Sequence, residues 1–413
     1  MTDTMTSAAP DGTTETPQYD VIVVGARCAG SPTAMLLARK GYKVLLVDRA
    51  TFPSDTISTH IVHPPGVAAL ARWGLLDRVV STGCPAITTY AFDMGPFVLA
   101  GSPGADETPA AYGPRRTVLD KLLLDAAADA GAEVREGFTV EDLVCERDSV
   151  TGIRAHDKGG PTIIEHARVV VGADGLHSRV ATAVGAPAYN ERARLQAGYY
   201  TYWSGLPMEG RFEAYDRGDR AWAAWPTNDD LTVVVVSWPF AQFEANKTDV
   251  ARHYLGALER APAFHDRIRA ATCEDRIVGT AVPNFFRRPY GPGWALVGDA
   301  GYMRDFMTAQ GMTDAFRDAE LCAGALDEWL SGRRSFDAAM GAYQSSRDER
   351  VGPMYEFTCQ FASFTPPTPE MQQLFASMTG NQAAMDGFAQ VVAGVLSPVE
   401  FFSEGAGANP QQA

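Results

Sequence analysis

Two glycines and one acidic residue near the start of the chain have the spacing that a dinucleotide site requires. Residues 19–48 read YDVIVVGARCAGSPTAMLLARKGYKVLLVD, with Gly25 and Gly30 after one apolar run and Asp48 at the end of the next. In the fingerprint G-x-G-x-x-G the glycines allow a tight turn and close packing, and an acid about 20 residues later accepts a ribose hydroxyl. Arg27 replaces the middle glycine, and a guanidinium can swing aside and contact phosphate oxygens. The stretch predicts a dinucleotide turn, with a buried β-α-β unit that binds no ligand as the alternative.

A second segment places an acid directly after an apolar run. Residues 169–180 read VVVGADGLHSRV, so Asp174 follows a stretch that is typical of a strand buried on both faces. Ser178 has the residue type and the place of a helix N-cap. Alone, the segment fits any strand-to-turn junction.

A third segment combines an acid with the start of a helix. Gly298 and Asp299 end the apolar run at residues 295–297, and Gln310 with Gly311 opens a helix twelve residues after Gly298. An aspartate in such a place can hydrogen-bond a ribityl or ribose hydroxyl. The free N–H groups at the helix start can stabilise negative charge on a reduced flavin ring.

The elements that must position these residues follow from the apolar pattern. Buried parallel strands are predicted near residues 20–24, 42–47, 169–171 and 294–297, each followed by a glycine turn or a helix. Other predicted helices cover residues 34–40, 67–75 and 116–131, parts of 247–270, a long stretch from residue 310, and the region after 346, where prolines interrupt it.

The middle of the chain has a different character. Residues 196–238 are rich in aromatic and β-branched residues, with turn signals at Gly218-Asp219 and at residues 228–230, so they predict an antiparallel sheet. Because side chains alternate along a strand, Tyr200 and Tyr202 share one face and Tyr199, Thr201 and Trp203 share the other.

The three motifs, in this order and spacing, resemble those of the class A flavoprotein monooxygenases. That superfamily of aromatic hydroxylases also contains geranylgeranyl-reductase-like enzymes and flavin-dependent halogenases. The resemblance spans residues 20–326. It implies an α/β (α+β) fold: a Rossmann-type FAD-binding domain with an inserted antiparallel-sheet substrate domain and a helical C-terminal region. The implied cofactors are FAD and, as reductant, NAD(P)H.

The resemblance also assigns roles. The first motif would bind the ADP half of FAD, the GADG segment would lie near the pyrophosphate, and the G-D motif would hold the ribityl chain. An arginine at a helix start would lie near the flavin, a slot that Arg116 fits and Arg115 neighbours, although a solvated helix-start arginine is the alternative. The expected cofactor-binding residues are Gly25, Arg27, Cys28, Ala29, Gly30, Asp48, Arg49, Arg116, Asp174, Gly298, Asp299, Gln310, Gly311 and Met312.

The chain departs from the family pattern beside the flavin. Where the third motif usually reads G-D-A-A-H-x-x-x-P-x-x-G-Q-G, this chain has Tyr302 for His, Phe306 for Pro and Ala309 for the first Gly of G-Q-G. Phe306 is bulkier than proline and restores a backbone N–H, so it is expected to reshape the oxygen or substrate side of the ring.

Candidate catalytic residues are those expected close to the flavin. They are His60, Tyr302 and Phe306. His60 and His63 would form a proton relay or a gate, and a histidine that bonds loop backbone is the alternative. Two histidines without a carboxylate at metal spacing predict no metal site.

The aromatic sheet is the expected wall of the substrate cavity. By resemblance, one face of such a sheet lies over the flavin, and the pocket candidates are Tyr200, Tyr202, Trp222 and Trp225. A role in the hydrophobic core is the alternative for each. The segment from Trp222 to Pro226 only partly matches the G-W-x-W-x-I-P segment of the halogenases, which disfavours halogenation.

These features together predict a FAD-dependent monooxygenase. It would use NAD(P)H and O2, through a flavin C4a-hydroperoxide, to hydroxylate or epoxidise an apolar aromatic or polyene molecule of specialised metabolism. A reductase or dehydrogenase of the geranylgeranyl-reductase type, and a flavin-binding protein without turnover, are the alternatives.

Composition limits the partners. The net charge of −15 argues against nucleic acid and anionic membranes. No apolar run is long enough for a transmembrane helix, no secretory signal is apparent, and six scattered cysteines fit a reduced cytoplasmic protein, as monomer or homodimer.

The expected domain organisation is discontinuous. Residues 1–18 and the last residues, GAGANPQQA, are predicted to be disordered tails. The FAD-binding domain would comprise residues 19–85, 114–190 and 274–345. The substrate-binding domain would comprise residues 86–113 and 191–273, and a helical region would comprise residues 346–413.

Overall fold

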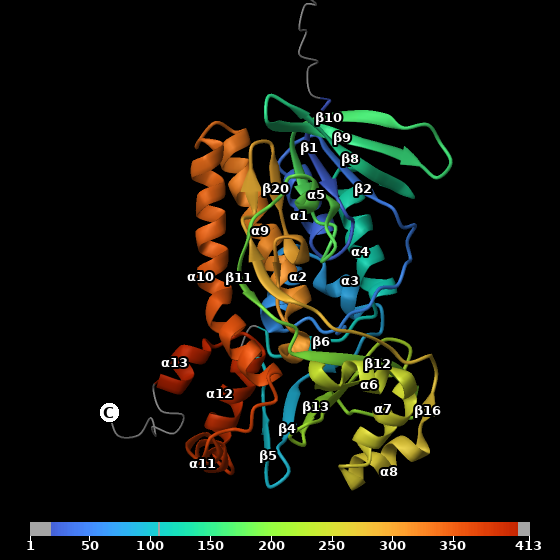
Figure 1. Ribbon diagram of the computed structural model, residues 1–413, viewed down its shortest axis with the longest axis vertical. Coiled ribbons are helices and arrows are strands. Elements are labelled where there is room, and N and C mark those ends of the chain that lie inside the picture. Colours follow the sequence, from blue (N-terminus) through green and yellow to red (C-terminus); the bar gives the residue numbers. More distant parts are fainter. Residues whose placement is uncertain (1–17, 106–107, 404–413) are drawn as a thin grey trace, which may run out of the picture.

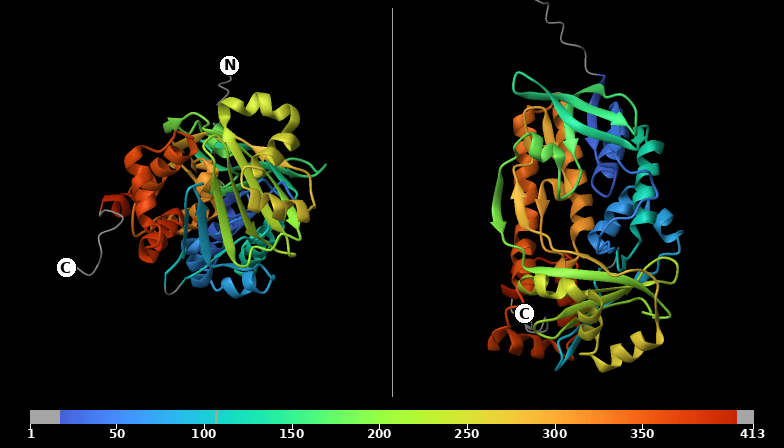
Figure 2. Two further views of the ribbon diagram at one scale, coloured as in Figure 1. Left: turned by 90° about the horizontal axis from the view of Figure 1, so that it is seen from below. Right: turned by 45° about the vertical axis from the view of Figure 1, so that its right-hand side comes forward.

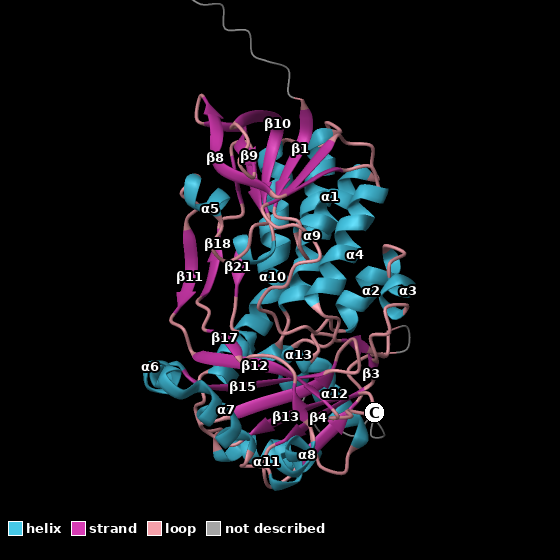
Figure 3. Cartoon of the chain, turned by 90° about the vertical axis from the view of Figure 1, so that its right-hand side faces the viewer, coloured by secondary structure: helices cyan, strands magenta, loops and turns pink. Residues whose placement is uncertain are grey.

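A computed structural model describes residues 18–105 and 108–403 of the chain. The predicted tails, at residues 1–17 and 405–413, lie outside the described residues. Two sheets form opposite ends of the molecule, with helices between and beside them (Figures 1 and 3). The predicted α/β fold class is confirmed. No helix among the described residues has the length and apolarity needed to span a membrane.

The first sheet is the predicted parallel one. Along its main strand order, β19-β20-β10-β1-β2-β7, every neighbouring pair is parallel except β19 with β20. The strands are β1 (Tyr19–Val24), β2 (Val44–Asp48), β7 (Glu133–Glu136), β10 (Ile163–Gly172), β19 (Tyr290–Gly291) and β20 (Trp294–Leu296). Val21, Val23, Val169 and Val171 are fully buried on one face and Ile22 and Val170 on the other, as the continuous apolar runs predict.

Helices cover one face of this sheet and extend towards the middle of the molecule. They are α1 (Gly30–Ala38), α2 (Pro64–Arg72), α3 (Leu76–Val80), α4 (Arg116–Asp129) and α9 (Gly311–Leu330), and α5 (Arg179–Ala183) lies by the other face. The hairpin of β8 (Phe138–Glu146) and β9 (Ser149–Asp157) extends the sheet through β10. That hairpin was not predicted, although Phe138 and Val140, and Ile153 and Ala155, alternate with polar residues.

The second sheet forms the other end of the molecule (Figure 3). Its order is β16-β12-β15-β14-β13-β4-β5, with β17 beside β12. The strands are β4 (Thr89–Asp93), β5 (Val98–Gly101), β12 (Gln196–Ser204), β13 (Arg211–Asp216), β14 (Ala221–Pro226), β15 (Thr232–Pro239), β16 (Thr272–Cys273) and β17 (Val278–Thr280). The predicted antiparallel sheet at residues 196–238 is confirmed: β13, β14 and β15 pair in sequence, and β12 pairs with β15. Gly218, Asp229 and Asp230 in its turns have positive φ angles.

The two faces of the second sheet have different neighbours. Three helices cover its outer face: α6 (Phe243–Asn246), α7 (Val250–Leu258) and α8 (Pro262–Ala270) (Figure 2, right). The inner face packs against the C-terminal helices α11 (Pro369–Met378) and α12 (Gln382–Val392), and α13 (Pro398–Ser403) follows. The helix breaks predicted at the prolines near residues 366 and 398 are confirmed.

Long elements connect the two ends. Helix α10 (Phe336–Ala362) runs along the side of the molecule in Figure 1 and continues through Pro353. Strands β11 (Ala188–Arg192), β18 (Asn284–Arg287) and β21 (Tyr302–Met303) form a small sheet between the ends (Figure 3). Two short strands, β3 (Ala86–Ile87) and β6 (Ala111–Tyr112), pair beside the second sheet.

Candidate functional site

A cavity of about 780 Å³ lies between the carboxyl ends of the parallel strands and the inner face of the second sheet. Gly25, Asp48, Asp174 and Gly298 line one part of it, each at or just after the carboxyl end of a strand of the first sheet. This is the edge at which open α/β sheets bind ligands. Tyr200, Trp225 and Val233 of the second sheet line the opposite part. One cavity therefore joins the predicted dinucleotide motifs to the predicted substrate sheet.

The first turn has the backbone geometry of a dinucleotide fingerprint. Gly25 has φ +102°, and a Cβ atom there would lie 2.4 Å from the carbonyl oxygen of Ala173. The Asp48 carboxylate accepts hydrogen bonds from the N–H groups of Ala26 and Ala50, both at 2.8 Å. Asp48 thus stabilises the turn as well as facing the cavity.

Arg27 lines the cavity as predicted, but its donors already have partners in the protein. Its guanidinium donates to the Ser54 carbonyl and the Ser54 hydroxyl, both at 3.0 Å, and forms an ion pair with Asp120 at 2.6 Å. It also lies over the Phe52 ring. The side chain does swing aside, but its donors hold the strap, the cavity-lining loop at residues 51–59, rather than pointing freely at a phosphate.

Asp120 is a functional residue that the sequence analysis missed. Its carboxylate is fully buried and pairs with Arg27 and, at 3.0 Å, with Arg116, while Cys28 Sγ donates to it at 3.3 Å. Because Arg116 lines the cavity, Asp120 links the strap to the arginine expected beside the flavin. The spacing of four residues between Arg116 and Asp120 on one helix was the available signal.

The second motif supports a helix start as predicted. Ser178 Oγ accepts from the Ala181 N–H at 2.9 Å, so the expected N-cap is confirmed. Asp174 Oδ2 accepts from the Arg179 and Val180 N–H groups, and its other oxygen is buried without a hydrogen-bond partner in the described part of the chain.

The third motif places a carboxylate in the cavity. Gly298 has φ +61°, and Asp299 lines the cavity without a hydrogen bond to its carboxylate among the described residues. Burial raises the pKa of Asp299 to about 6, although Arg116 opposes the shift. A half-buried carboxylate with free acceptor sites that lines the cavity fits the hydroxyl groups of a polyol chain.

The remaining cofactor candidates divide by position. Cys28, Ala29, Arg49, Gly311 and Met312 line the cavity. Gly30 lies behind it, where the helix packs against the Gly25 carbonyl. The Gln310 side chain turns away and donates to the Val392 carbonyl at 2.7 Å, so only its backbone is part of the helix start.

Neither histidine lies where a relay to the flavin was expected. His60 is fully buried, with Nε2 at 2.7 Å from the Tyr202 hydroxyl, and is not among the residues that line the cavity. Burial, assisted by Arg116, lowers the pKa of His60 to about 3. His63 bonds the Thr308 carbonyl and the Tyr90 hydroxyl. The alternative of a histidine bonded to loop backbone describes His63. His60 instead bonds a tyrosine of β12, and its Nδ1 has no hydrogen-bond partner among the described residues.

The aromatic candidates divide in the same way. Tyr200 and Trp225 line the cavity, and Tyr202 lies on the same face but bonds His60. Trp222 is on the outer face, stacked on Tyr215 under α8, so its assignment to the substrate pocket was wrong. It precedes Trp225 by three residues on one strand, and an odd separation puts two side chains on opposite faces.

Tyr302 and Phe306 both line the cavity, as predicted for flavin-proximal residues. The Tyr302 hydroxyl is buried without a hydrogen-bond partner among the described residues, and burial raises its pKa well above the ordinary value. The Phe306 ring lies against Gly198 of β12. Ala309 has φ +53°, so it keeps the left-handed backbone for which the family uses glycine.

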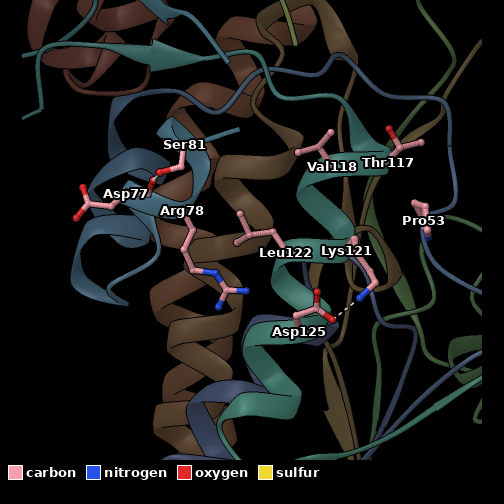
Figure 4. A pocket seen from close by; sticks show the side chains of 9 residues that line it. All are labelled: Pro53, Asp77, Arg78, Ser81, Thr117, Val118, Lys121, Leu122 and Asp125. Carbon is pink, nitrogen blue, oxygen red and sulfur yellow. Dashed lines mark hydrogen bonds and ion pairs between the residues drawn. The ribbon is translucent and has the colours of Figure 1, made fainter. Parts of the chain in front are cut away.

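A second, shallower hollow lies between α3 and α4 (Figure 4). Lys121 and Asp125 pair across one turn of α4, and Arg78 approaches from α3. None of the three motifs contributes to this hollow, although Pro53 of the strap lines it. The larger cavity is therefore the candidate site.

Asp299→Asn should separate cofactor binding from stability. Since the carboxylate has no partner in the fold, we expect the FAD-stripped variant to be as stable as wild type or slightly more so at pH 8. FAD affinity should fall about tenfold or more, as a charge-assisted hydrogen bond is lost. FAD titration by fluorescence quenching and melting of the stripped protein measure both. Asp48→Asn is the control, expected to lose stability as well as affinity; an Asp299 variant that loses both would contradict this assignment.

Phe306→Ala should act on the cavity rather than on the fold. The ring is half-buried and faces the cavity, whereas Phe316 on α9 is fully buried in the core. We expect Phe316→Ala to cost about 3–5 kcal/mol of unfolding free energy, and Phe306→Ala clearly less. Urea unfolding of the two variants compares them. Flavin reoxidation should change only in Phe306→Ala; equal stability losses with unchanged reoxidation would show that Phe306 is a core residue.

Comparison with known proteins agrees with this geometry. A family model described as FAD binding domain matches residues 18–358. The digeranylgeranylglycerophospholipid reductase of Methanothrix thermoacetophila is 28% identical over 81% of this chain and 84% of its own. The phenazine 1,6-dicarboxylic acid hydroxylase of Lysobacter antibioticus is 31% identical over 49% of this chain and 52% of its own length. A myxobacterial FAD-dependent chondrochloren halogenase has the same fold, with a TM-score of 0.77 and 23% sequence identity. The similarity covers 92% of this chain and 99% of the halogenase.

Proposed function

The chain belongs to the FAD binding domain family of FAD-dependent oxidoreductases, and from this premise we propose that it is an NAD(P)H-dependent monooxygenase. Its substrate would be an apolar aromatic or polyene small molecule of specialised metabolism. The observation that carries the proposal is a single cavity whose lining includes both Asp299 and the aromatic side chains Tyr200, Trp225 and Phe306.

The residues of the cavity fit FAD. Gly25 allows the tight turn that leads from β1 along the cavity to α1, with its Cα against the Ala173 carbonyl, and the start of α9 lines the same cavity, where its N–H groups can contact a bound anionic group. Asp48 and Asp299 provide carboxylates for the ribose and the ribityl chain. When bound, FAD would supply the redox chemistry, taking electrons from NAD(P)H and passing them to O2.

The protein's own contribution is orientation, charge and exclusion of water. Arg116 lies between Asp120 and the cavity, where its positive charge stabilises a developing negative charge. Tyr200, Trp225 and Phe306 give the substrate side an aromatic lining that suits a flat, apolar molecule. The strap that Arg27 holds lies along the cavity and limits access of water to it.

Two relatives support different reactions. The relative named a phenazine dicarboxylic acid hydroxylase favours oxygen insertion into a flat aromatic ring. The reductase relative favours reduction of unsaturated bonds, and its match covers more of both chains. The aromatic lining at Tyr200 and Trp225 favours the hydroxylase, so reduction is the second candidate.

Labelled oxygen distinguishes these two reactions. The purified protein is incubated with NAD(P)H, 18O2 and a panel of phenazines, other aromatic acids and polyenes. We expect one labelled oxygen atom in the product, with the other atom in water. A product that gains two hydrogens and no label, and that also forms under nitrogen, would establish the reductase. If one molecule of hydrogen peroxide forms per NAD(P)H with every member of the panel, the proposed substrate class is wrong.

A further inference from the structure

Asp305 forms a buried pair with Gln196 at the wall of the cavity. Asp305 precedes Phe306, and it makes three hydrogen bonds, two through its side chain and one through its backbone N–H. Gln196 Nε2, on β12, donates to Asp305 Oδ1. The Met307 N–H donates to the same oxygen at 3.0 Å. The Asp305 N–H donates to Asn284 Oδ1 on β18 at 2.6 Å. Asp305 is 1% exposed and Gln196 is not exposed at all.

Two acceptor atoms of this pair have no partner. Asp305 Oδ2 and Gln196 Oε1 are both buried, and neither has a hydrogen-bond donor among the described residues. Each of these buried acceptors has lost its hydrogen bonds to water without gaining one in the protein, which is costly. A proton on Oδ2 would satisfy both, because a carboxylic acid and an amide can close a ring of two hydrogen bonds: Nε2–H to Oδ1 and Oδ2–H to Oε1.

We propose that Asp305 and Gln196 share one proton as an acid–amide pair, and that this pair positions Phe306 in the cavity. The surroundings favour the protonated acid. Burial raises the pKa of Asp305 to about 7, although the Gln196 and backbone N–H groups oppose the shift. The other titratable groups nearby are Cys359 on α10, whose pKa burial raises to about 11, and Arg304, which is ion-paired with Asp314 at 2.6 Å.

The pair fixes the segment that carries Phe306. Asp305 caps the short 3-10 helix η4 (Phe306–Thr308), and the Phe306 ring lies against Gly198, two residues beyond Gln196 on the same face of β12. A Cβ atom at Gly198 would lie 2.5 Å from two atoms of that ring, so glycine makes the contact possible. Ionisation would remove the Oδ2–H donor and leave Gln196 Oε1 buried without a partner among the described residues, which would weaken the hold of the pair on η4.

The pH dependence of stability tests the proton. A folded-state pKa near 7 against about 4 in the unfolded chain means that the folded protein holds the extra proton in this window. Its stabilisation is complete below pH 4 and is lost as the pH rises to 7. Asp305→Asn keeps the ring, since an amide pairs with an amide, but cannot ionise. We expect the folding equilibrium constant of wild type to fall, relative to this variant, by up to roughly tenfold per pH unit between pH 4 and 7.

The spectrum of bound FAD tests the positioning, which rests on the proposed function. Between pH 5 and 9 we expect the FAD absorbance and fluorescence of wild type to change with a midpoint near 7. Asp305→Asn should show the low-pH spectrum throughout. Gln196→Leu removes the partner and should show the high-pH spectrum throughout.

Each arm can overturn the proposal. A stability ratio that does not change with pH means that Asp305 ionises normally. A FAD spectrum that titrates alike in wild type and Asp305→Asn means that the pair does not position the cavity wall. If the Asn variant does not fold, the comparison of Gln196→Leu with wild type still decides the matter. A protein without FAD would defeat the proposed function, yet the stability comparison would remain valid.

Discussion

Gly25→Ala is expected to abolish FAD binding and to destabilise the chain by more than about 3 kcal/mol. Alanine at φ +102° is strained by about 1–3 kcal/mol. In addition, its Cβ would lie 2.4 Å from the backbone carbonyl oxygen of Ala173, which cannot move without disrupting β10. FAD titration of the purified variant and its urea unfolding curve give the two effects.

Gly41→Ala is the matched control for Gly25. Gly41 also has a positive φ, +89°, but a Cβ atom there would have no atom within 4 Å. The Gly41→Ala variant should therefore lose only the unfolding free energy that the strained backbone costs, about 1–3 kcal/mol. It should keep its FAD. If both variants lose the same stability and both retain FAD, the contact with Ala173 does not define the dinucleotide turn.

Asp120→Ala is expected to cost about 3–5 kcal/mol. It would leave Arg27 and Arg116 without the buried carboxylate that both contact. The strap should loosen as well, so endoproteinase Asp-N should cleave the variant faster at the bond between Ser54, which Arg27 holds, and Asp55. Urea unfolding measures the first effect and timed proteolysis measures the second.

Asp125→Ala, on the same helix, is the control for Asp120. Asp125 pairs with Lys121, but both side chains are about two-fifths exposed (Figure 4). An exposed pair of this kind contributes about 0.3–0.5 kcal/mol. A loss at Asp120 no larger than the loss at Asp125 would mean that the buried network does not stabilise the site.

The sequence predicted best where one physical cause dominates. Strands buried on both faces must be apolar throughout, so the strands at residues 20–24, 169–171 and 294–297 were recognised. Gly25, Asp174 and Asp299 come at the carboxyl ends of these parallel strands, and they therefore lie at the same edge of the sheet. The inner and outer faces of β12 followed from alternation alone.

It failed where partners come from distant segments. That Arg27 holds the strap depends on Ser54 and Asp120, and that His60 is buried depends on Tyr202; no spacing in the chain brings these residues together. Trp222 was assigned to the wrong face because it is aromatic like Trp225. The face of a strand residue depends on its position, and an odd separation of three places these two side chains on opposite faces. The Asp305–Gln196 pair joins residues 109 positions apart, and its orphaned oxygens become visible only in the folded molecule.

The central claim is that this cavity holds a FAD that NAD(P)H reduces and O2 reoxidises. The most direct measurement follows the absorbance of the purified protein, reconstituted with FAD, through one cycle in a stopped-flow spectrophotometer. We expect one FAD per chain, loss of the yellow flavin band when NADH or NADPH is added under nitrogen, and full recovery of the band on mixing with O2. A protein that takes up no FAD, or whose bound FAD stays oxidised with both nucleotides and every tested substrate, would contradict the account.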